Sequence, residues 1–483
     1  MWLVTHGLGS DPFFHSPMSE NDAGCVSPDP ASTVTDRLNS ALNSSGSGFI
    51  LRLCPSREYL LLTPLFFSAQ DQEISTLGYP LGSDRATLVV NGPVSNGTGH
   101  TTAVDGTCPS CSGVKLRNIR INGTRSGAPP TEGGANIEMG GSTSGQLIEH
   151  VASFNPRSWS CLHIAEGSLN CNNVTVQHND IGPCGTDDFQ QWADGISMSC
   201  RNSLVRNNTI IDPTDGGIVL FGAPGTVVEN NTILVQNQML LGGINLVDYE
   251  PYRGDYSGTV VRNNRIAGAF ANAPAGVGET RGVNIEHAII KIGIAIGPRT
   301  WFGDRFGTNA SVSGTVTDNE FTGAFSYAMA VSSSRNFTVQ NNVLVGNTSF
   351  IGAAGPNCSE DQTLPQPYPF VVDGNNSAGL HLQPDFRVIS DGDALTCVIP
   401  PDGGAFWPVG GPPWTDGGSP GSSDDDTHRA PSGLTGGAIA GIVIGIVLGL
   451  SAVAALGWFA RRRVRTRSAY GSRIMPAPSS QKA

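Results

Sequence analysis

Charged residues are scarce in this sequence, making up only 14% of its 483 residues. Soluble globular domains carry about a quarter. Long runs of Lys or Glu, which favour exposed helices, are also few. This scarcity argues against a helical cytosolic enzyme. The 62 glycines, together with repeated asparagines, favour tightly turned β-structure instead.

Acidic residues are missing from residues 461–483, which carry seven basic ones. The remainder of the chain holds 21 basic against 40 acidic residues. An electrostatic field of that sign repels nucleic acid and, more weakly, polyanionic sugars. We therefore predict no nucleic-acid partner.

A signal peptide is not visible, because residues 1–10 (MWLVTHGLGS) have neither a basic start nor an apolar core. An apolar stretch does occur at residues 437–459, which form a run of 23 uncharged residues. As a helix this run is about 35 Å long, enough to cross a bilayer. Five arginines follow it closely, as the positive-inside rule requires. The sequence thus predicts one membrane helix and a large domain outside the cell.

Two explanations of the missing signal peptide stay open. Either the sequence starts downstream of one, which we favour, or the chain is tail-anchored and faces the cytosol. Within the predicted membrane helix, small residues recur at every fourth position and offer a face for weak dimerisation, although glycine is common in such helices. These residues are Gly437, Gly441, Gly445 and Gly449.

Cysteines and glycosylation sequons agree with an extracellular location. The chain has ten cysteines, an even number. We expect pairings between sequence neighbours, namely 25/54, 108/111, 161/171, 184/200 and 358/397. No second CxxC or nearby His pair accompanies Cys108 and Cys111, so no metal site is predicted. Asn-x-Ser/Thr sequons occur at Asn43, Asn96, Asn122, Asn173, Asn207, Asn230, Asn309, Asn336, Asn347, Asn357 and Asn375.

Internal repetition is the strongest signal in the chain. A hexad of the form apolar-x-Asn/Asp-Asn-x-apolar recurs at intervals that are typical of a solenoid. Its apolar positions alternate and are often β-branched, which predicts strands. The copies are Val205–Ile210, Val228–Ile233, Val261–Ile266, Val316–Phe321 and Val339–Leu344, with a weaker one at Val176–Ile181.

A second alternating segment precedes most hexads, so each coil has at least two short strands. Stacking pairs each strand with its copy in the next coil and buries a continuous apolar column. The Asn pairs are expected to form turns and a hydrogen-bonded ladder, in competition with glycosylation at Asn207 and Asn230. The second segments begin at Gly195, Gly217, Gly243, Gly293 and Tyr327.

With these motifs, residues 108–347 resemble the right-handed parallel β-helix repeat proteins of the pectin-lyase-like superfamily, and the whole chain is similar to membrane-anchored forms seen in fungi. The expected fold is all-β with capping segments, and a helix is predicted at 34–42 and strands at 49–53 and 86–90. The predicted parts are a leading or capping segment at 1–107, the β-helix at 108–347, a C-terminal cap at 348–399, a Pro/Gly/Ser-rich tether at 400–433, the transmembrane helix at 434–460 and a basic cytosolic tail at 461–483.

Carboxylates gather where a β-helix would expose one face to a polysaccharide. If Ile196, Ile218 and Ile244 stack in the core, then Ser197, Val219 and Asn245 form an outward stripe, bordered by acidic and aromatic residues. The catalytic candidates are Asp187, Asp188, Asp194, Asp215 and His178. The candidates for substrate binding are Trp192, Asn245, Asp248, Tyr249, Arg253, Arg299 and Trp301.

Paired carboxylates suit glycoside hydrolysis, one as acid and one as base or nucleophile. Carboxylates with Ca²⁺ and a basic residue would suit β-elimination on uronates, so a Ca²⁺ cofactor stays open. The structural alternative is that Asp194 and Asp215 precede glycine merely as turn formers. Asp187 and Asp188 resemble the paired aspartates of polygalacturonases, but the Gly-His-Gly and Arg-Ile-Lys elements of that family are absent. The Tyr-Gly-Phe-Asp-Pro-His-Asp motif of mannuronan epimerases is absent as well.

Two functions are therefore carried forward. The favoured one is a polysaccharide hydrolase or lyase that acts on cell-wall glycans at the cell surface. The alternative is a non-catalytic wall-binding or adhesive protein that uses the same face, and a purely structural solenoid ranks third.

Overall fold

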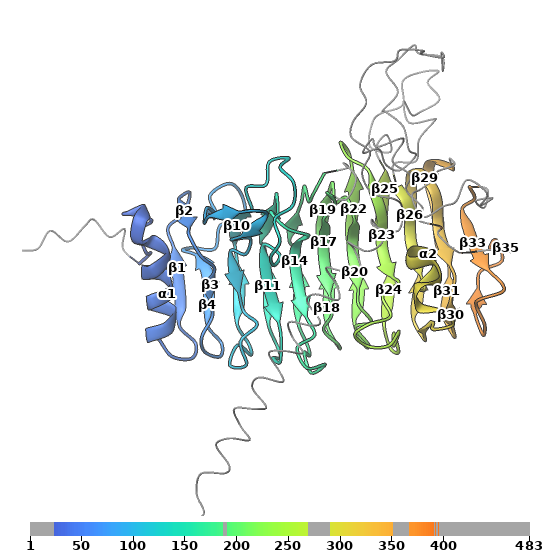
Figure 1. Ribbon diagram of the computed structural model, residues 1–483, viewed down its shortest axis with the longest axis horizontal. Coiled ribbons are helices and arrows are strands. Elements are labelled where there is room, and N and C mark those ends of the chain that lie inside the picture. Colours follow the sequence, from blue (N-terminus) through green and yellow to red (C-terminus); the bar gives the residue numbers. More distant parts are fainter. Residues whose placement is uncertain are drawn as a thin grey trace, which may run out of the picture. The chain divides into compact units, whose positions relative to one another are not determined.

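The computed structural model describes residues 24–186, 191–268, 290–350 and 367–390, together with Gly392 and Leu395. In these residues the chain winds through successive coils, and three columns of short strands run along the stack (Figure 1). Strands in each column pair in parallel with their copies in the neighbouring coils. The predicted solenoid of stacked strands is confirmed.

The first column forms a sheet of eleven strands. In order along the stack they are β1 (Ile50–Leu53), β4 (Glu73–Thr76), β9 (Lys115–Arg117), β12 (Leu147–Glu149), β15 (Thr175–Gln177), β18 (Leu204–Arg206), β21 (Val227–Glu229), β24 (Val260–Arg262), β28 (Thr315–Thr317), β31 (Thr338–Gln340) and β34 (His381–Leu382).

The second column follows the first after a tight turn in most coils. It consists of β2 (Glu58–Leu61), β5 (Ala86–Val90), β10 (Ile119–Asn122), β13 (Ala152–Phe154), β16 (Asp180–Ile181), β19 (Thr209–Ile211), β22 (Thr232–Val235), β25 (Arg265–Gly268), the start of β29 (Glu320–Val331) and β32 (Val343–Phe350).

The third column carries the Gly-Ile segments noted in the sequence. It consists of β3 (Leu65–Phe66), β8 (Val104–Asp105), β11 (Ile137–Gly140), β14 (Ser160–Ala165), β17 (Asp194–Met198), β20 (Gly216–Leu220), β23 (Leu240–Leu246), β26 (Ile290–Ile296), the end of β29, β33 (Phe370–Asp373) and β35 (Arg387–Ile389).

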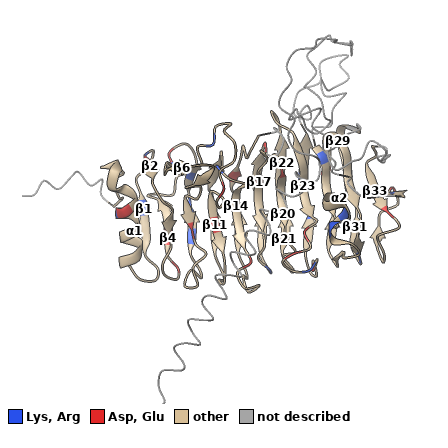
Figure 2. Cartoon of the chain, in the orientation of Figure 1, with Lys and Arg blue, Asp and Glu red and all other residues tan. Residues whose placement is uncertain are grey.

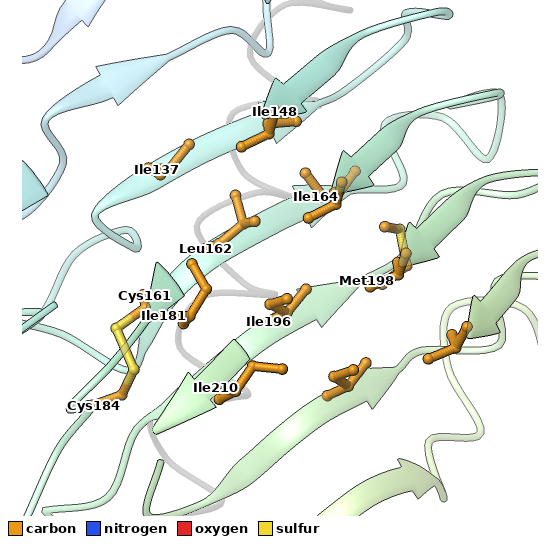
Figure 3. Close-up of a cluster of buried hydrophobic side chains, with 14 of the residues drawn as sticks. Ile137, Ile148, Cys161, Leu162, Ile164, Ile181, Cys184, Ile196, Met198 and Ile210 are labelled. Atoms are coloured by element: carbon orange, nitrogen blue, oxygen red, sulfur yellow. A yellow bond between two sulfur atoms is a disulfide. The ribbon is translucent and has the colours of Figure 1, made fainter. Parts of the chain in front are cut away.

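Apolar side chains of the three columns meet in a continuous core, part of which Figure 3 shows as stacked Ile, Leu and Met side chains. Val205, Val228 and Val261 are fully buried and in register, so the hexads superpose as predicted. Ile196, Ile218 and Ile244 likewise stack in the core. Burying one such side chain contributes about 1.5–3 kcal/mol.

A short helix closes the N-terminal end of the stack. The 3₁₀ turn η1 (Ala31–Thr33) leads into α1 (Val34–Ser44), confirming the predicted helix. Val34, Leu38 and Leu42 recur at helical spacing and are fully buried against the first coil. Because β1 already belongs to the first column, the coil stack begins before residue 108, and it continues past residue 347 through β33, β34 and β35.

The smaller elements lie between the columns. These are the antiparallel pair β6 (Val94–Ser95) and β7 (Thr98–Gly99), the parallel pair β27 (Ser311–Val312) and β30 (Ser334–Arg335), the helix α2 (Arg299–Phe302) and the 3₁₀ turn η3 (Gly303–Phe306).

The turn between the first and second columns carries an asparagine ladder. The second Asn of each hexad is buried, and its Nδ2 donates to Oδ1 of the equivalent Asn one coil further on, except that Asn342 at the end of the ladder donates to Gln383 Oε1. Asn208 donates to Asn231 at 2.9 Å, and Asn231 to Asn264 at 2.9 Å. The first Asn of each pair, such as Asn207 with φ 54° and Asn230 with φ 56°, adopts the left-handed conformation and is exposed. The ladder therefore leaves the sequon side chains of Asn207 and Asn230 free of the packing.

Four disulfides link the described part of the chain. Cys25–Cys54 and Cys108–Cys111 match the predicted pairs. The pairings 161/171 and 184/200 are wrong, because the bonds join Cys161 to Cys184 and Cys171 to Cys200. Stacking places residues one coil apart next to each other, so these disulfides connect neighbouring coils. The pair 358/397 lies outside the described residues.

Among the described residues, no helix is long and apolar enough to cross a membrane. The predicted transmembrane helix, with its glycine face, lies outside those residues, as do the tether and the basic tail.

Candidate functional site

The Gly-Ile pairs of the third column decide which side chains face outward. A Cβ at Gly195 would lie 2.6 Å from the carbonyl oxygen of Gly217, and one at Gly217 would lie 2.5 Å from that of Gly243. Only glycine fits where the coils approach so closely. The following Ile packs in the core, and the next residue faces outward. Those outward residues, Ser197, Val219 and Asn245, are in register as expected.

A second outward row runs beside this one, formed by the residue that precedes each Gly-Ile pair. It contains Asp194, Gly216 and Gly242 in successive coils. A Cβ at Gly216 would lie 3.0 Å from Asp194 Oδ1 and 3.0 Å from Asn245 Nδ2. Glycine at this position therefore gives the Asp194 and Asn245 side chains room to lie over strand β20.

Asp194 is only 6% exposed and accepts two hydrogen bonds. The Gly216 amide donates to Oδ1 at 2.8 Å, and the Ser197 hydroxyl donates to Oδ2 at 2.8 Å. Both bonds favour the ionised carboxylate. Burial and the negative charges of Asp215 and Asp248 outweigh them, so the pKa of Asp194 lies well above its ordinary value.

Asp215 and Asp248 complete a cluster of three carboxylates, which we call the acid cluster. Asp215 directly precedes β20, and Asp248 follows β23, so the three aspartates come from three successive coils. Burial raises the pKa of Asp215 to about 6. Burial, followed by the charge of Asp215, raises the pKa of Asp248 to about 8, against the opposing charge of Arg305. At neutral pH, Asp248 is therefore mainly protonated and Asp215 mainly ionised.

Trp301, in helix α2, borders the acid cluster on the side of the later coils. A Cβ at Gly242 would lie 2.8 Å from Cζ3 of this indole, so the ring covers strand β23. Trp192, Met239 and Leu241 pack with Trp301. Beyond it, an apolar cluster covers the outer face of β26 and β29, and its members are Val247, Ile292, Ala295, Tyr327, Ala330, Val371 and Leu395, with Trp301, Phe302 and Ile389 packed against them.

Asn245 is the least satisfied polar group of the site. It is 1% exposed, and its Oδ1 has no hydrogen-bond partner. Leaving a buried acceptor unpaired costs about 1–3 kcal/mol. Such a group in a folded protein calls for an explanation, and a ligand hydroxyl donating to Oδ1 would supply one.

The other predicted site residues are distributed differently. His178 lies in the turn of the asparagine ladder, with φ 57°, and stacks on His150 at 5.3 Å between ring centroids. Its place in that turn separates it from the outer face of the third column. Arg253 is exposed in a turn, and Tyr249 packs on Phe306 at 5.6 Å. Arg299 begins α2, next to Trp301. Asp187 and Asp188 lie outside the described residues.

Sequence reasoning missed Lys291, Glu138 and His163. Lys291, in β26, is 1% exposed, and burial lowers its pKa to about 7. The signal that could have revealed it is a single Lys in an otherwise apolar run. Glu138 and His163 extend the outward stripe toward the earlier coils, in register with Ser197. Their sequence neighbourhood carries no motif, so only the register reveals them.

Charged side chains are few on the described part of the chain (Figure 2), so three aspartates gathered on one face are unusual here. Within the described ranges, no group of three or more His, Cys, Asp or Glu side chains is arranged to hold a metal ion. The raised pKa values of Asp194 and Asp248 suit these carboxyls to hold a proton at a pH where an ordinary aspartate is ionised.

A family model described as "Right handed beta helix region" matches residues 168–363. The matched residues lie within the stack of parallel coils, and over this region the chain is similar to right-handed β-helix proteins. No curated protein sequence matches it.

Several solved structures are similar to this β-helix protein. The A-module of the mannuronan C-5 epimerase AlgE6 from Azotobacter vinelandii is 11% identical, with 80% of this chain and 96% of that chain covered and a TM-score of 0.45. An alginate lyase from Paenibacillus sp. is 14% identical, with 66% and 96% covered and a TM-score of 0.38. PfbA, a surface adhesin of Streptococcus pneumoniae, is 12% identical, with 74% and 89% covered and a TM-score of 0.40. At these identities the likeness does not extend to function.

Proposed function

We propose that this β-helix protein is a polysaccharide hydrolase whose reaction takes place at the acid cluster. The observation that carries the proposal is the convergence of Asp194, Asp215 and Asp248, from three successive coils, on one outward face. Buried turn formers would not keep charges so close together, because mutual repulsion and burial both work against ionisation. Retaining three such groups is typical of a site that moves protons.

Hydrolysis of a glycosidic bond needs one carboxylic acid and one carboxylate. Asp248, with its pKa raised to about 8, suits the acid that protonates the leaving oxygen. Asp215, with a pKa of about 6, suits the base that removes a proton from water as the water attacks the anomeric carbon. The bond from carbon to the leaving oxygen breaks, and the proton from water ends on Asp215.

Asp194 supports this pair without reacting itself. Its two hydrogen bonds, from Gly216 and Ser197, fix its position, and burial together with the charges of Asp215 and Asp248 raises its pKa. Asn245 would accept a hydrogen bond from a sugar hydroxyl through its unpaired Oδ1.

A lyase acting on uronates is the second candidate, and Lys291 is the observation that favours it. An amine with a pKa lowered to about 7 is suited to abstract a proton at neutral pH. A polyanionic substrate would, however, meet the negative field of the acid cluster. A neutral glycan fits this face better, so hydrolysis is preferred. Adhesive binding without turnover is the remaining alternative.

Location at the cell surface, with an anchor at residues 434–460, is part of the same proposal. The four disulfides of the described chain support it, because such bonds persist in oxidising compartments. Among the residues that the structure describes, nine sequon asparagines are exposed and would be accessible to glycans, namely Asn43, Asn96, Asn173, Asn207, Asn230, Asn309, Asn336, Asn347 and Asn375. A mobility shift after glycosidase treatment checks this location.

The catalytic proposal is tested by incubating the purified full-length chain with a panel of neutral and acidic polysaccharides. New reducing ends report hydrolysis, and ultraviolet absorbance of unsaturated products reports elimination. Asp215→Asn and Asp248→Asn should each lower the rate by about 10²–10⁴-fold, as expected for loss of a general acid or base.

Asp318→Asn is the matched control. This aspartate is exposed in the ladder turn, where other coils carry Asn, and the same isosteric change there should leave the rate intact. Binding of a polysaccharide without turnover under any condition would exclude the enzyme and leave the adhesive function.

A further inference from the structure

Trp159 lies one coil before the acid cluster on the same outer face. Its backbone carbonyl accepts the hydrogen bond of the Asp194 amide at 2.8 Å, which fixes this neighbourhood. The side chain is 36% exposed, which is unusual for tryptophan, the largest of the aromatic residue types. Its indole Nε1 donates to the Gly133 carbonyl at 3.2 Å, so the ring is held in one orientation.

His163 and Glu138 stand beside this indole. The rings of Trp159 and His163 meet edge to face, with centroids 4.9 Å apart. His163 Nδ1 lies 2.7 Å from Glu138 Oε2, and the Ala135 amide donates to Glu138 Oε1 at 2.6 Å. Because Glu138 accepts the proton of Nδ1, the neutral imidazole is left with Nε2 as an acceptor. The three side chains form a preorganised unit, which we call the Trp159 platform.

The two sides of the acid cluster differ in access. Toward the later coils, Trp301 and Phe302 of α2 cover the outer face, and Ile292 and Ala295 beneath them are fully buried. Toward the earlier coils, Ser197 is also fully buried, but one coil further on the stripe regains partial exposure at His163 and Glu138. A chain-like ligand bound over the acid cluster therefore meets partly exposed polar side chains on this side.

We propose that Trp159, His163 and Glu138 form a glycan-binding subsite, which holds a polysaccharide chain running from the acid cluster along the helix axis toward the earlier coils. The apolar face of a sugar ring stacks on the exposed indole, and its hydroxyls bond to His163 Nε2 and the Glu138 carboxylate. Coils repeat at about 4.8 Å, close to the length of one sugar unit, so successive units meet successive coils. This inference rests on the proposed function for the substrate class.

The test measures binding without turnover. The full chain carrying Asp215→Asn is titrated calorimetrically with cello-, xylo-, manno- and laminari-oligosaccharides of two to six units. Affinity for at least one series should rise with chain length. In the same background Trp159→Ala should remove that rise, weakening the hexasaccharide about tenfold and the disaccharide far less, whereas Trp159→Tyr should retain most of it.

Tyr368→Ala is the control for position. Tyr368 is 37% exposed, close to the 36% of Trp159, but it precedes β33, beyond the apolar cluster that closes the later coils. Its loss should leave every affinity unchanged. The subsite is ruled out if Trp159→Ala changes no affinity, if it weakens all chain lengths equally, if Tyr368→Ala has the same effect, or if no series binds.

These outcomes are separate from those of the catalytic test. If Trp159→Ala removes the gain in affinity with chain length but the protein cleaves no polysaccharide, the subsite is supported and the hydrolase is excluded. If cleavage depends on Asp215 but Trp159→Ala changes no affinity, the hydrolase is supported and the subsite is excluded.

Discussion

The asparagine ladder and the acid cluster both consist of polar side chains from successive coils. The ladder pairs its hydrogen-bonding groups, whereas the acid cluster brings like charges together. In the ladder, the Asn231 amide bonds to both neighbouring asparagines and to the Val205 carbonyl. In the acid cluster, burial raises the pKa of all three aspartates, the charge of Asp215 adds to the rise at Asp194 and Asp248, and Asn245 nearby keeps an unpaired oxygen.

The difference teaches how to separate structural from functional repetition in a solenoid. A ladder repeats one residue type, because each copy satisfies the next, and every coil gains stability. The acid cluster brings three aspartates together from non-equivalent positions of their coils and loses stability through burial and repulsion. Rows of equivalent side chains that satisfy one another hold the stack together. Like charges that meet from non-equivalent positions point to a site.

The largest effect that tests this comparison is expected from Asn231→Ala. It removes hydrogen bonds to Asn208, Asn264 and Val205 and leaves buried partners unpaired. We expect it to lower the free energy of unfolding by about 3 kcal/mol or more, since each unpaired group costs about 1–3 kcal/mol. Urea unfolding followed by circular dichroism measures the loss.

Asn230→Gly is the matched control, one residue earlier in the same turn. Its side chain is exposed and its φ is 56°, a conformation that glycine adopts freely. Its free energy of unfolding should stay within about 0.5 kcal/mol of the parent. Equal destabilisation by the two variants would mean that the buried ladder has no special role.

Asp248→Asn should act in the opposite direction and depend on pH. The pKa of Asp248 is about 8 in the folded chain and about 3.9 when unfolded, so between these values the native state binds more protons. Stability of the parent then falls as pH rises from about 4 to 8. The full shift corresponds to about 5 kcal/mol at pH 8. Because Asp248 is partly exposed, solvent screening reduces this value, and the variant should be more stable by ~2 kcal/mol at pH 8 and unchanged at pH 4. Asp318→Asn, at its exposed turn, should show no such pH dependence, and a flat parent profile would contradict the raised pKa.

Much of the fold is predictable from the sequence because each repeat carries its own pattern of strand and turn residues. The hexads of Val205–Ile210 and Val228–Ile233 carry alternation, turn chemistry and spacing together, and the structure superposes them. Disulfide pairing was predictable only in part. Cys161 joins Cys184 rather than Cys171, because proximity in a solenoid runs between coils and not along the chain.

The candidate site was less accessible to sequence reasoning, for a physical reason. The Gly-Ile segments fix the outward stripe, so Ser197, Val219 and Asn245 could be placed from alternation alone. Which loop residues meet above that stripe depends on the paths of the loops, which no periodicity encodes. Trp159 and the Glu138–His163 pair were not predicted, because only the register of their strands with those of later coils places them beside the acid cluster.

The smallest effect is expected from His178→Asn, which assigns this histidine to one of the two rows. His178 has φ 57° and occupies the turn position held by Asn207 one coil later. Asparagine tolerates that conformation well, which compensates for the lost stacking on His150. The free energy of unfolding should change by no more than about 0.5 kcal/mol, and turnover should be unaffected. A rate loss comparable to that of Asp215→Asn would instead place a catalytic group in the ladder turn and undo the separation between the two rows.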